Sequence, residues 1–509
     1  MTKSFAILLV AVCGMASAVA TSSTTVRIDS GALQGALETD VIAFRGIPYV
    51  APPVGVLRWR APQLVVSWSG VRPATSFGNA CLQPPPGPRE PALGAPQSED
   101  CLYLNIWRPA SAKTKLPVMV WIHGGGFTKG ASSIANSDGA GFARRGVVLV
   151  SINYRVGYLG FFAHPALTRE AADGGQIANY GLMDQIAALR WVQRNIHAFG
   201  GDASRVTIFG QSAGAFSVEA LMASPRAHGL FHRAIVMSGY YRGSYPRISM
   251  SAPDGRRSAE EDGAAALKGI GVETTDVAVL RGLTAQQLTS LPPHGFNGGI
   301  PAIDGRYVVE DLWTTFRSGR EAPVPMIVGA TSQETPPLPP EVRAQVHAVL
   351  AKFISPAEEA ALLLVYGGQQ GLDQSLGSDF SFAALLRSLA QLHMTHGHAS
   401  YRYRFAALPA SAPSTLLGLP HAGDIAYVFG TLAAGMWKMD ARDRAVSDAA
   451  MDYWVEFARS GRPTPPHRPA WPSAADDQIM LFDNDGAKPQ VDDRAARYKA
   501  LAKIVDPKS

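Results

Sequence analysis

Short apolar runs rich in β-branched residues recur along this chain and alternate with segments of helical periodicity. Residues 147–152 are apolar at nearly every position, which is typical of a strand buried on both faces of a sheet. Residues 181–195 place Leu182, Ile186 and Leu189 at helical spacing, and the pattern ends at a glycine pair. Further strands are predicted at residues 101–107, 117–122, 206–209, 234–237 and 325–328. Strands that alternate with helices predict an α/β fold, with a mostly parallel central sheet covered by helices on both faces.

The N-terminal part of the chain carries a different pattern. Two short β-branched runs, residues 26–29 and 41–44, predict a small N-terminal antiparallel patch. Proline-rich stretches at residues 84–88 and 336–340 are too short to be linkers and predict rigid loops. No Gly/Ser linker, charge block or internal repeat divides the 509 residues. We therefore predict one large domain over residues 21–509, with enough apolar sequence to bury a sizeable core.

The first residues have the pattern of a secretory signal peptide. Lys3 precedes an apolar run over residues 5–15, and small residues follow it. This predicts a signal peptide over residues 1–20, cleaved near Ala18 or Ala20, and an exported protein that is periplasmic or secreted. The apolar run is too short to cross a membrane, and no other segment is long and apolar enough to do so.

The chain has three cysteines. Cys13 lies inside the predicted signal peptide, where a lipoprotein signal is the alternative, but Val12 stands where such a signal requires a small residue. Cleavage leaves Cys81 and Cys101. An even number of cysteines in an exported chain predicts one disulfide that closes a short loop, and two buried free thiols are the alternative.

The charge of the chain carries little functional information. The formal net charge is +5, and the basic residues are scattered and belong to no nucleic-acid-binding motif. We therefore interpret them as a solvated surface and expect no nucleic-acid partner.

Two glycine-rich turns follow predicted strands and carry the most specific chemistry. After the strand at residues 206–209 comes Gly210-Gln-Ser-Ala-Gly214, a Gly-x-Ser-x-Gly sequence at a strand-to-helix turn, which presents Ser212 above the sheet. After the strand at residues 117–122 comes His-Gly-Gly-Gly-Phe at residues 123–127. Glycine-rich backbone beside such a serine is what an oxyanion hole requires. The two turns together predict a serine hydrolase.

A serine nucleophile needs a base, and the base needs an acid behind it. In α/β-hydrolases the order along the chain is serine, acid, histidine. Glu334 lies just past the predicted strand at residues 325–328 and is therefore the preferred acid. Other acidic residues lie in the same interval but do not directly follow so clear a strand end: Asp304, Glu310, Asp311 and Glu321.

The base must be a histidine that follows the acid. The histidines after Glu334 are His347, His393, His396, His398, His421 and His467. His421 stands in a loop at residues 418–424 that leads into an apolar segment, and rigid scaffolds commonly carry catalytic groups on such loops. His421 is therefore the preferred base.

His393, His396 and His398 could be imagined as a metal site. No cysteine or acid cluster accompanies them in the sequence, and their segment predicts a helix end before a strand. Residues 124–126 are not a phosphate loop, because no Gly-Lys-Ser/Thr follows. We therefore expect no metal and no cofactor.

The chain resembles the type-B carboxylesterases, the family that includes cholinesterases and bacterial para-nitrobenzyl esterases. The resemblance spans nearly the whole chain after the signal peptide. It is carried, besides the Gly210–Gly214 turn, by residues 44–49, 52–58, 98–107, 123–127, 179–185, 191–202, 453–458 and 469–472.

The resemblance implies an α/β-hydrolase fold and hydrolysis of a small-molecule ester by water. It implies that Ser212 is the nucleophile, Glu334 the acid and His421 the base. The oxyanion donors would be the backbone N–H groups of Gly125, Gly126 and Ala213. The pair Cys81 and Cys101 matches the N-terminal disulfide of the family.

Two positions depart from the family pattern. Gln211 stands where the family usually has Glu, which removes a charge near His421 and affects the pKa of that base. Thr335 stands where the family usually has Gly after the acid, and a β-branched residue resists a positive φ.

Alternatives on the same catalytic residues are amidase, thioesterase and lipase activity. The segment between Cys81 and Cys101 is short and proline-rich, so it is a poor amphipathic lid, and we favour an esterase for dissolved substrates. A non-catalytic binding module like the cholinesterase-like adhesion domains is disfavoured, because Ser212, Glu334 and His421 are all present. Tyr240 and Tyr241 either line the acyl side of the site or are ordinary surface or packing aromatics.

Overall fold

The computed structural model describes residues 23–88, 90–111, 115–171, 178–239, 245–253, 255–291, 300–350 and 354–505. The predicted signal peptide, and Tyr240 and Tyr241, lie outside the described residues.

The strands are β1 (Thr25–Ile28), β2 (Gly31–Gln34), β3 (Ala36–Glu38), β4 (Val41–Pro48), β5 (Val71–Pro73), β6 (Ala80–Cys81), β7 (Gln97–Ser98), β8 (Tyr103–Pro109), β9 (Leu116–Ile122), β10 (Val148–Ile152), β11 (Gly201–Gln211), β12 (Arg233–Met237), β13 (Met326–Thr331), β14 (Ser400–Phe405), β15 (Gln478–Asp483) and β16 (Gly486–Val491). The α-helices are α1 (Ala140–Arg144), α2 (Gly157–Gly160), α3 (Pro165–Glu170), α4 (Tyr180–Asn195), α5 (Ala213–Ala223), α6 (Ala259–Gly269), α7 (Val277–Arg281), α8 (Ala285–Thr289), α9 (Leu312–Arg317), α10 (Pro340–Leu350), α11 (Pro356–Tyr366), α12 (Gln369–Ser378), α13 (Ala384–Thr395), α14 (Ile425–Phe429), α15 (Ala441–Ser460) and α16 (Ala495–Val505).

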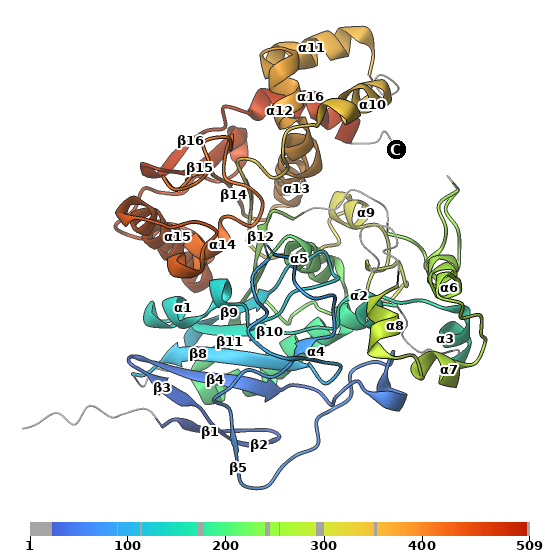
Figure 1. Cartoon of the computed structure of the whole chain (residues 1–509). Helices are drawn as coiled ribbons and strands as arrows, with labels where there is room; N and C mark the ends of the chain where they lie inside the picture. Colours follow the sequence, from blue (N-terminus) through green and yellow to red (C-terminus); the bar gives the residue numbers. More distant parts are fainter. Residues whose placement is uncertain are drawn as a thin grey trace, which may run out of the picture.

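An eleven-stranded mixed sheet organises the molecule. Its order is β16-β15-β14-β13-β12-β11-β9-β10-β8-β4-β3. The strands from β10 to β15 in this order are parallel, whereas β16, β8, β4 and β3 pair antiparallel at the two edges. The predicted mostly parallel sheet is confirmed, and Figure 1 shows its strands with helices around them. The central strand β11 ends at Gln211, directly before Ser212.

Alternating side chains of the central strands point into two separate cores. On β9, Val118 and Val120 belong to a core with residues of α4 and α5, such as Ile186 and Val218. Met119 and Trp121 of the same strand belong to a second core with α14 and α15. Because a strand turns successive side chains to opposite faces, this division shows helices covering both faces of the sheet. Every residue of β10 is buried, as the apolar run predicted.

The predicted N-terminal patch is divided between two sheets. β1 pairs antiparallel with β2 in a small sheet of order β1-β2-β5, whereas β4 pairs antiparallel with β3 and β8 in the large sheet. The burial patterns explain the difference. β1 alternates exposed and buried residues, which suits a sheet with one face in water. The first residues of β4 are all buried, so this strand needs cover on both faces.

Cys81 and Cys101 form the predicted disulfide, across a sequence separation of 20 residues. Both cysteines are buried, and β6, which ends at Cys81, pairs with β7 inside the closed loop. The disulfide therefore fixes a segment that is poor in regular structure. Among the described residues, no helix has both the length and the apolar character that crossing a membrane requires.

The turn between β11 and α5 packs against the end of β9 with no room for a side chain. A Cβ on Gly214 would lie 2.0 Å from the carbonyl oxygen of Ile122, and a Cβ on Gly210 would lie 2.4 Å from the carbonyl carbon of Gly214. Both glycines of the Gly-x-Ser-x-Gly sequence are therefore required by close backbone contact.

Removing the disulfide should destabilise the fold. The double variant Cys81→Ser with Cys101→Ser frees a loop of about twenty residues in the unfolded chain, for which we expect a loss of about 3 kcal/mol in the free energy of unfolding. Urea unfolding of the variant, beside the native protein with and without reductant, measures this loss. Equal stability of all three samples would contradict the expectation.

Gly214→Ala should also destabilise the protein, because the new methyl group must push α5 away from Ile122. Overpacking of this kind costs about 1–3 kcal/mol. The matched control is Gly282→Ala, whose Cβ would meet its nearest atoms at an ordinary 3.4 Å and whose φ is −78°. Thermal unfolding should show a lower midpoint for the Gly214 variant alone. If both variants melt at the native temperature, the contact is not restrictive.

Candidate active site

Ser212 occupies the sharp turn between the central strand and α5. Its backbone has φ 56° and ψ −125°, and its N–H donates to the carbonyl oxygen of Met237 at 3.0 Å. A non-glycine residue with this φ costs about 1–3 kcal/mol and persists only where its surroundings fix it. Here the neighbouring glycines and the β12 end fix it. The turn places Ser212 at the carboxyl end of the parallel strands, where α/β sheets commonly bind ligands.

The predicted acid and base lie in direct contact. Glu334 follows β13 and is buried, and its Oε2 accepts a hydrogen bond from Nδ1 of His421 at 2.5 Å. Its Oε1 accepts from the hydroxyl of Ser238 and from the N–H of Thr331, each at 2.6 Å. These bonds satisfy the carboxylate and give it one orientation. They also leave Nε2 of His421 as the nitrogen that faces the serine turn.

The two loops that carry this pair are joined by their backbones. Gln333 and Pro420 form an isolated parallel β-bridge, and the N–H of Gln333 donates to Leu419 at 3.0 Å. The N–H of Leu419 donates to the hydroxyl of Ser332 at 2.9 Å. Because each loop holds the other next to the functional side chain, the contact between Glu334 and His421 does not depend on one hydrogen bond alone.

A second buried acid, Asp424, acts on the same histidine. Asp424 is fully buried and accepts a hydrogen bond from the hydroxyl of Tyr403 at 3.1 Å. Burial, together with the negative charge of Glu334, raises the pKa of Asp424 to about 7. Burial of His421 lowers its pKa, but the charges of Glu334 and Asp424 outweigh this effect, and the pKa of His421 lies above its ordinary value of 6.5.

Gln211 makes direct contact with the histidine. Its side-chain nitrogen lies 3.2 Å from Nε2 of His421. Because Nδ1 donates to Glu334, Nε2 is the accepting nitrogen and the amide of Gln211 is the donor. Ser212 and His421 are both described, and no hydrogen bond joins the serine Oγ to Nε2. The departure from the family pattern at residue 211 therefore acts on the nitrogen that would accept the serine proton.

The second departure, Thr335, is accommodated without a positive φ. Its N–H donates to the hydroxyl of Ser378 at 3.0 Å. The β-branched residue thus has an ordinary backbone conformation and a partner on α12.

The glycine loop after β9 lies against the serine turn. A Cβ on Gly124 would lie 3.2 Å from Cβ of Ser212, and Gly125 and Gly126 take φ values of 106° and 63°. Within the described part of the chain, no protein acceptor receives the N–H groups of Gly125, Gly126 or Ala213. Three such unsatisfied donors beside one hydroxyl can bind a negatively charged oxygen.

His123 packs against the glycine loop and contacts its backbone. Its ring stacks on Tyr154 with centroids 4.4 Å apart, and Nδ1 contacts the carbonyl oxygen of Gly124 at 2.9 Å. The hydroxyl of Tyr154 donates to the carbonyl oxygen of His123 at 2.8 Å. Burial lowers the pKa of His123 to about 4, so this ring is neutral and structural at neutral pH.

A cavity of about 470 Å³ opens beside these groups, and its lining includes Gly124, Gly125, Gln211 and Ala422. A larger cavity of about 830 Å³ is lined by other residues, among them Tyr158 and Phe162, and by none of the predicted site residues. The smaller cavity is therefore the candidate substrate cavity.

The other acids considered from the sequence lie elsewhere. Asp304 accepts backbone N–H groups of its own turn, Asp311 caps α9, Glu310 pairs with Arg320, and Glu321 contacts His393. None of them contacts His421. Sequence reasoning did not identify Ser238 or Asp424, although Ser238 directly follows a predicted strand and Asp424 lies three residues after His421.

Comparisons with known proteins identify the family of this chain. The model of the carboxylesterase family matches residues 22–355 and 369–500. The chain is 36% identical to a fumonisin B1 esterase from Sphingopyxis macrogoltabida, over 87% of this chain and 83% of the relative. It is 33% identical to a para-nitrobenzyl esterase from Bacillus subtilis strain 168, over 85% and 89%. A solved structure of a PNB esterase matches with a TM-score of 0.80 at 29% identity, covering 94% of this chain and 99% of that one.

Both the sequence match and the structural match extend across nearly the whole chain. The protein therefore belongs to the carboxylesterase family, has the α/β-hydrolase fold and is a carboxylic-ester hydrolase.

Proposed function

We propose that this enzyme hydrolyses carboxylic esters through an acyl-enzyme on Ser212, with His421 as general base and Glu334 as the acid that orients it. The observation that carries the proposal is the Glu334–His421 hydrogen bond, made beside a serine on a strained strand-to-helix turn. This is the arrangement that activates a serine hydroxyl at neutral pH.

The first half of the reaction forms the acyl-enzyme. Substrate binding exchanges the amide of Gln211 for the hydroxyl of Ser212 at Nε2 of His421. His421 takes the serine proton as Oγ attacks the ester carbonyl, and the imidazolium is stabilised by Glu334. The proton then passes to the leaving alcohol. In the second half, water takes the place of the alcohol and the same steps release the acid.

The proposed oxyanion hole consists of the backbone N–H groups of Gly125, Gly126 and Ala213. They are fixed before substrate binds, because the glycine loop contacts the serine turn and rests on His123. Preorganised donors of this kind stabilise the tetrahedral intermediate, and the loss of one typically costs about 10²–10³ in turnover.

The chemical class of substrate is proposed from the relatives. Their names refer to a fumonisin, a para-nitrobenzyl ester and, for a mouse protein that is 34% identical, a pyrethroid. Apart from being hydrolysed, the compounds in these names have little in common. We therefore propose small-molecule esters and water as the partners of this enzyme, in preference to amides and thioesters.

The structure favours dissolved esters over oil droplets. A lipase lid in the segment between Cys81 and Cys101 would need free apolar side chains. Leu93 is buried in a small core with Ala80 and Ala131, and Leu82 packs against the main core. The large aliphatic side chains of the segment are thus already used in packing.

We also propose that the enzyme is exported, as the N-terminal sequence predicts. The disulfide supports this proposal, because such bonds persist in oxidising compartments.

Ser212→Ala should abolish ester hydrolysis while the protein stays folded. Loss of the nucleophile should lower kcat for a para-nitrophenyl ester by about 10⁴–10⁶. The control is Ser204→Ala, an exposed serine whose hydroxyl and N–H donate hydrogen bonds to Asp202. A fluorophosphonate probe should label the native protein and the control, and should not label the Ser212 variant. Labelling or near-native turnover of that variant would exclude Ser212 as nucleophile, and an unlabelled native protein would favour a binding module.

The pH dependence of kcat/KM should reflect the effect of the neighbouring carboxylates on the pKa of His421. Only neutral His421 can accept the serine proton, so activity is lost as pH falls through its pKa, which lies above 6.5. Asp424→Asn removes a carboxyl whose ionised form favours the imidazolium, so the acid limb of kcat/KM should move to lower pH.

The matched control for this profile is Asp448→Asn, which changes a carboxylate that pairs with Arg145 at the surface. This variant should leave the acid limb of the kcat/KM profile at the same pH as in the native enzyme. An acid limb that stays unchanged in the Asp424 variant would show that Asp424 does not act on the base.

A further inference from the structure

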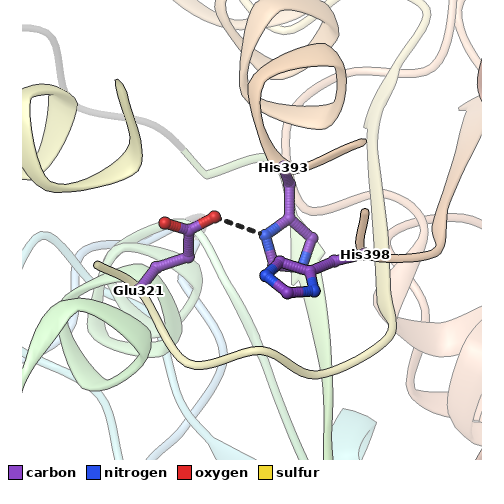
Figure 2. Close-up of side chains that lie close together, drawn as sticks. All are labelled: Glu321, His393 and His398. Atoms are coloured by element: carbon purple, nitrogen blue, oxygen red, sulfur yellow. Dashed lines mark hydrogen bonds and ion pairs between the residues drawn. The ribbon is translucent and has the colours of Figure 1, made fainter. Parts of the chain in front are cut away.

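A cluster of histidine and carboxylate side chains lies away from the serine site. Glu321 comes from the loop between α9 and β13, His393 from the last turn of α13, and His398 from the turn before β14. One ligand atom of each lies within 4.8 Å of the others, and Figure 2 shows the two imidazoles beside the carboxylate. His396 does not join them, because its Nε2 contacts the carbonyl oxygen of Phe316 at 3.1 Å.

The cluster is buried and its hydrogen bonding is incomplete. The side chains of Glu321 and His393 are 0% exposed, and Oε1 of the glutamate lies 2.7 Å from Nδ1 of the histidine. The other oxygen, Oε2, is buried without a hydrogen-bond partner among the described residues. The ring of His398, which is half-buried, likewise has no hydrogen bond to the described chain. An unpaired carboxylate oxygen in a protein interior is costly unless something further binds there.

We propose that Glu321, His393 and His398 bind a divalent transition metal, with Zn²⁺ as the best fit. Two imidazole nitrogens and one carboxylate are ligands that Zn²⁺ takes, and water would complete a tetrahedral set. In such a set the ligand atoms lie about 3.4 Å apart, from bonds of about 2.0–2.1 Å. This spacing lies between two distances in the cluster. Oε1 of Glu321 is 2.7 Å from Nδ1 of His393, and the three ligand atoms all lie within 4.8 Å of one another. Small side-chain rotations therefore suffice.

The surroundings of His393 suit a metal ligand. Its Nε2 contacts the carbonyl oxygen of Val324 at 2.8 Å. When Nε2–H donates to this oxygen, Nδ1 is left for the metal, and metal-bound histidines commonly make such an outer hydrogen bond. Binding displaces the proton between Nδ1 and Oε1 to solvent, and the metal takes its place.

The position of the cluster indicates a structural role. Glu321 and His398 precede the amino ends of β13 and β14, whereas Ser212 and Glu334 lie at the carboxyl ends of the sheet. A metal here would tie the loop before β13 to the turn before β14. The proposal does not rest on the serine chemistry, because the two sites are at opposite ends of the strands.

The test uses the full-length enzyme without an affinity tag, stripped with a chelator and then titrated with ZnCl₂ in a calorimeter. We expect one Zn²⁺ per chain and a higher thermal unfolding midpoint after binding. His398→Gln should weaken binding by more than the 10–100-fold typical of outer hydrogen-bonding partners. His396→Gln, a neighbouring histidine outside the cluster, should bind as the native enzyme does.

His398 is chosen because it is half-buried and its replacement is expected to leave the fold intact, which the unfolding midpoint of the stripped variant verifies. Substitution with Co²⁺ gives a second readout, because its visible absorption reports nitrogen and oxygen ligation. Absence of stoichiometric binding, or native affinity in the His398 variant, would overturn the proposal. Ester hydrolysis, measured on the same stripped and loaded samples, should be equal and tests the serine site separately.

Discussion

The approach of α5 to the end of β9 is the contact on which the rest of the site depends. The backbone of Gly214 lies so close to the carbonyl oxygen of Ile122 that a methyl group cannot fit between them. This contact fixes the start of α5, and with it the positive φ of Ser212. The same strand end continues into the glycine loop, so the proposed nucleophile and the proposed oxyanion donors share one rigid junction.

The histidine and its acid are held by a separate arrangement. Glu334 and His421 are 87 residues apart in the chain, and a β-bridge between their loops brings them together. Ser238, at the end of β12, completes the hydrogen bonding of the carboxylate. The proposed acid, base and nucleophile thus each lie at the carboxyl edge of the sheet. The sheet sets their relative positions, and the loops need to adjust only side-chain orientation.

Features that depend on a few adjacent residues could be predicted from the sequence, whereas features that depend on contacts between distant residues could not. Ser212 and the glycine loop have signatures in a few adjacent residues, because their backbone conformations demand glycine. Glu334 and His421 were selected from several candidates by strand position, chain order and family resemblance. The effect of Asp424 on His421, and the approach of Glu321 to His393, arise from packing between separate elements, which no local pattern records. The predicted small N-terminal sheet is confirmed for β1, whereas β4 lies in the main sheet because it is buried on both faces.

The amide at residue 211 has a consequence for the proposed proton transfer from Ser212 to His421. A carboxylate there could only accept a hydrogen bond, whereas the amide donates one to Nε2 of His421. The lone pair of Nε2, which in the proposed mechanism takes the serine proton, is thus engaged by the amide in this structure. Under the proposed mechanism this amide must leave Nε2 before Ser212 can lose its proton, so residue 211 adds one side-chain movement to each turnover.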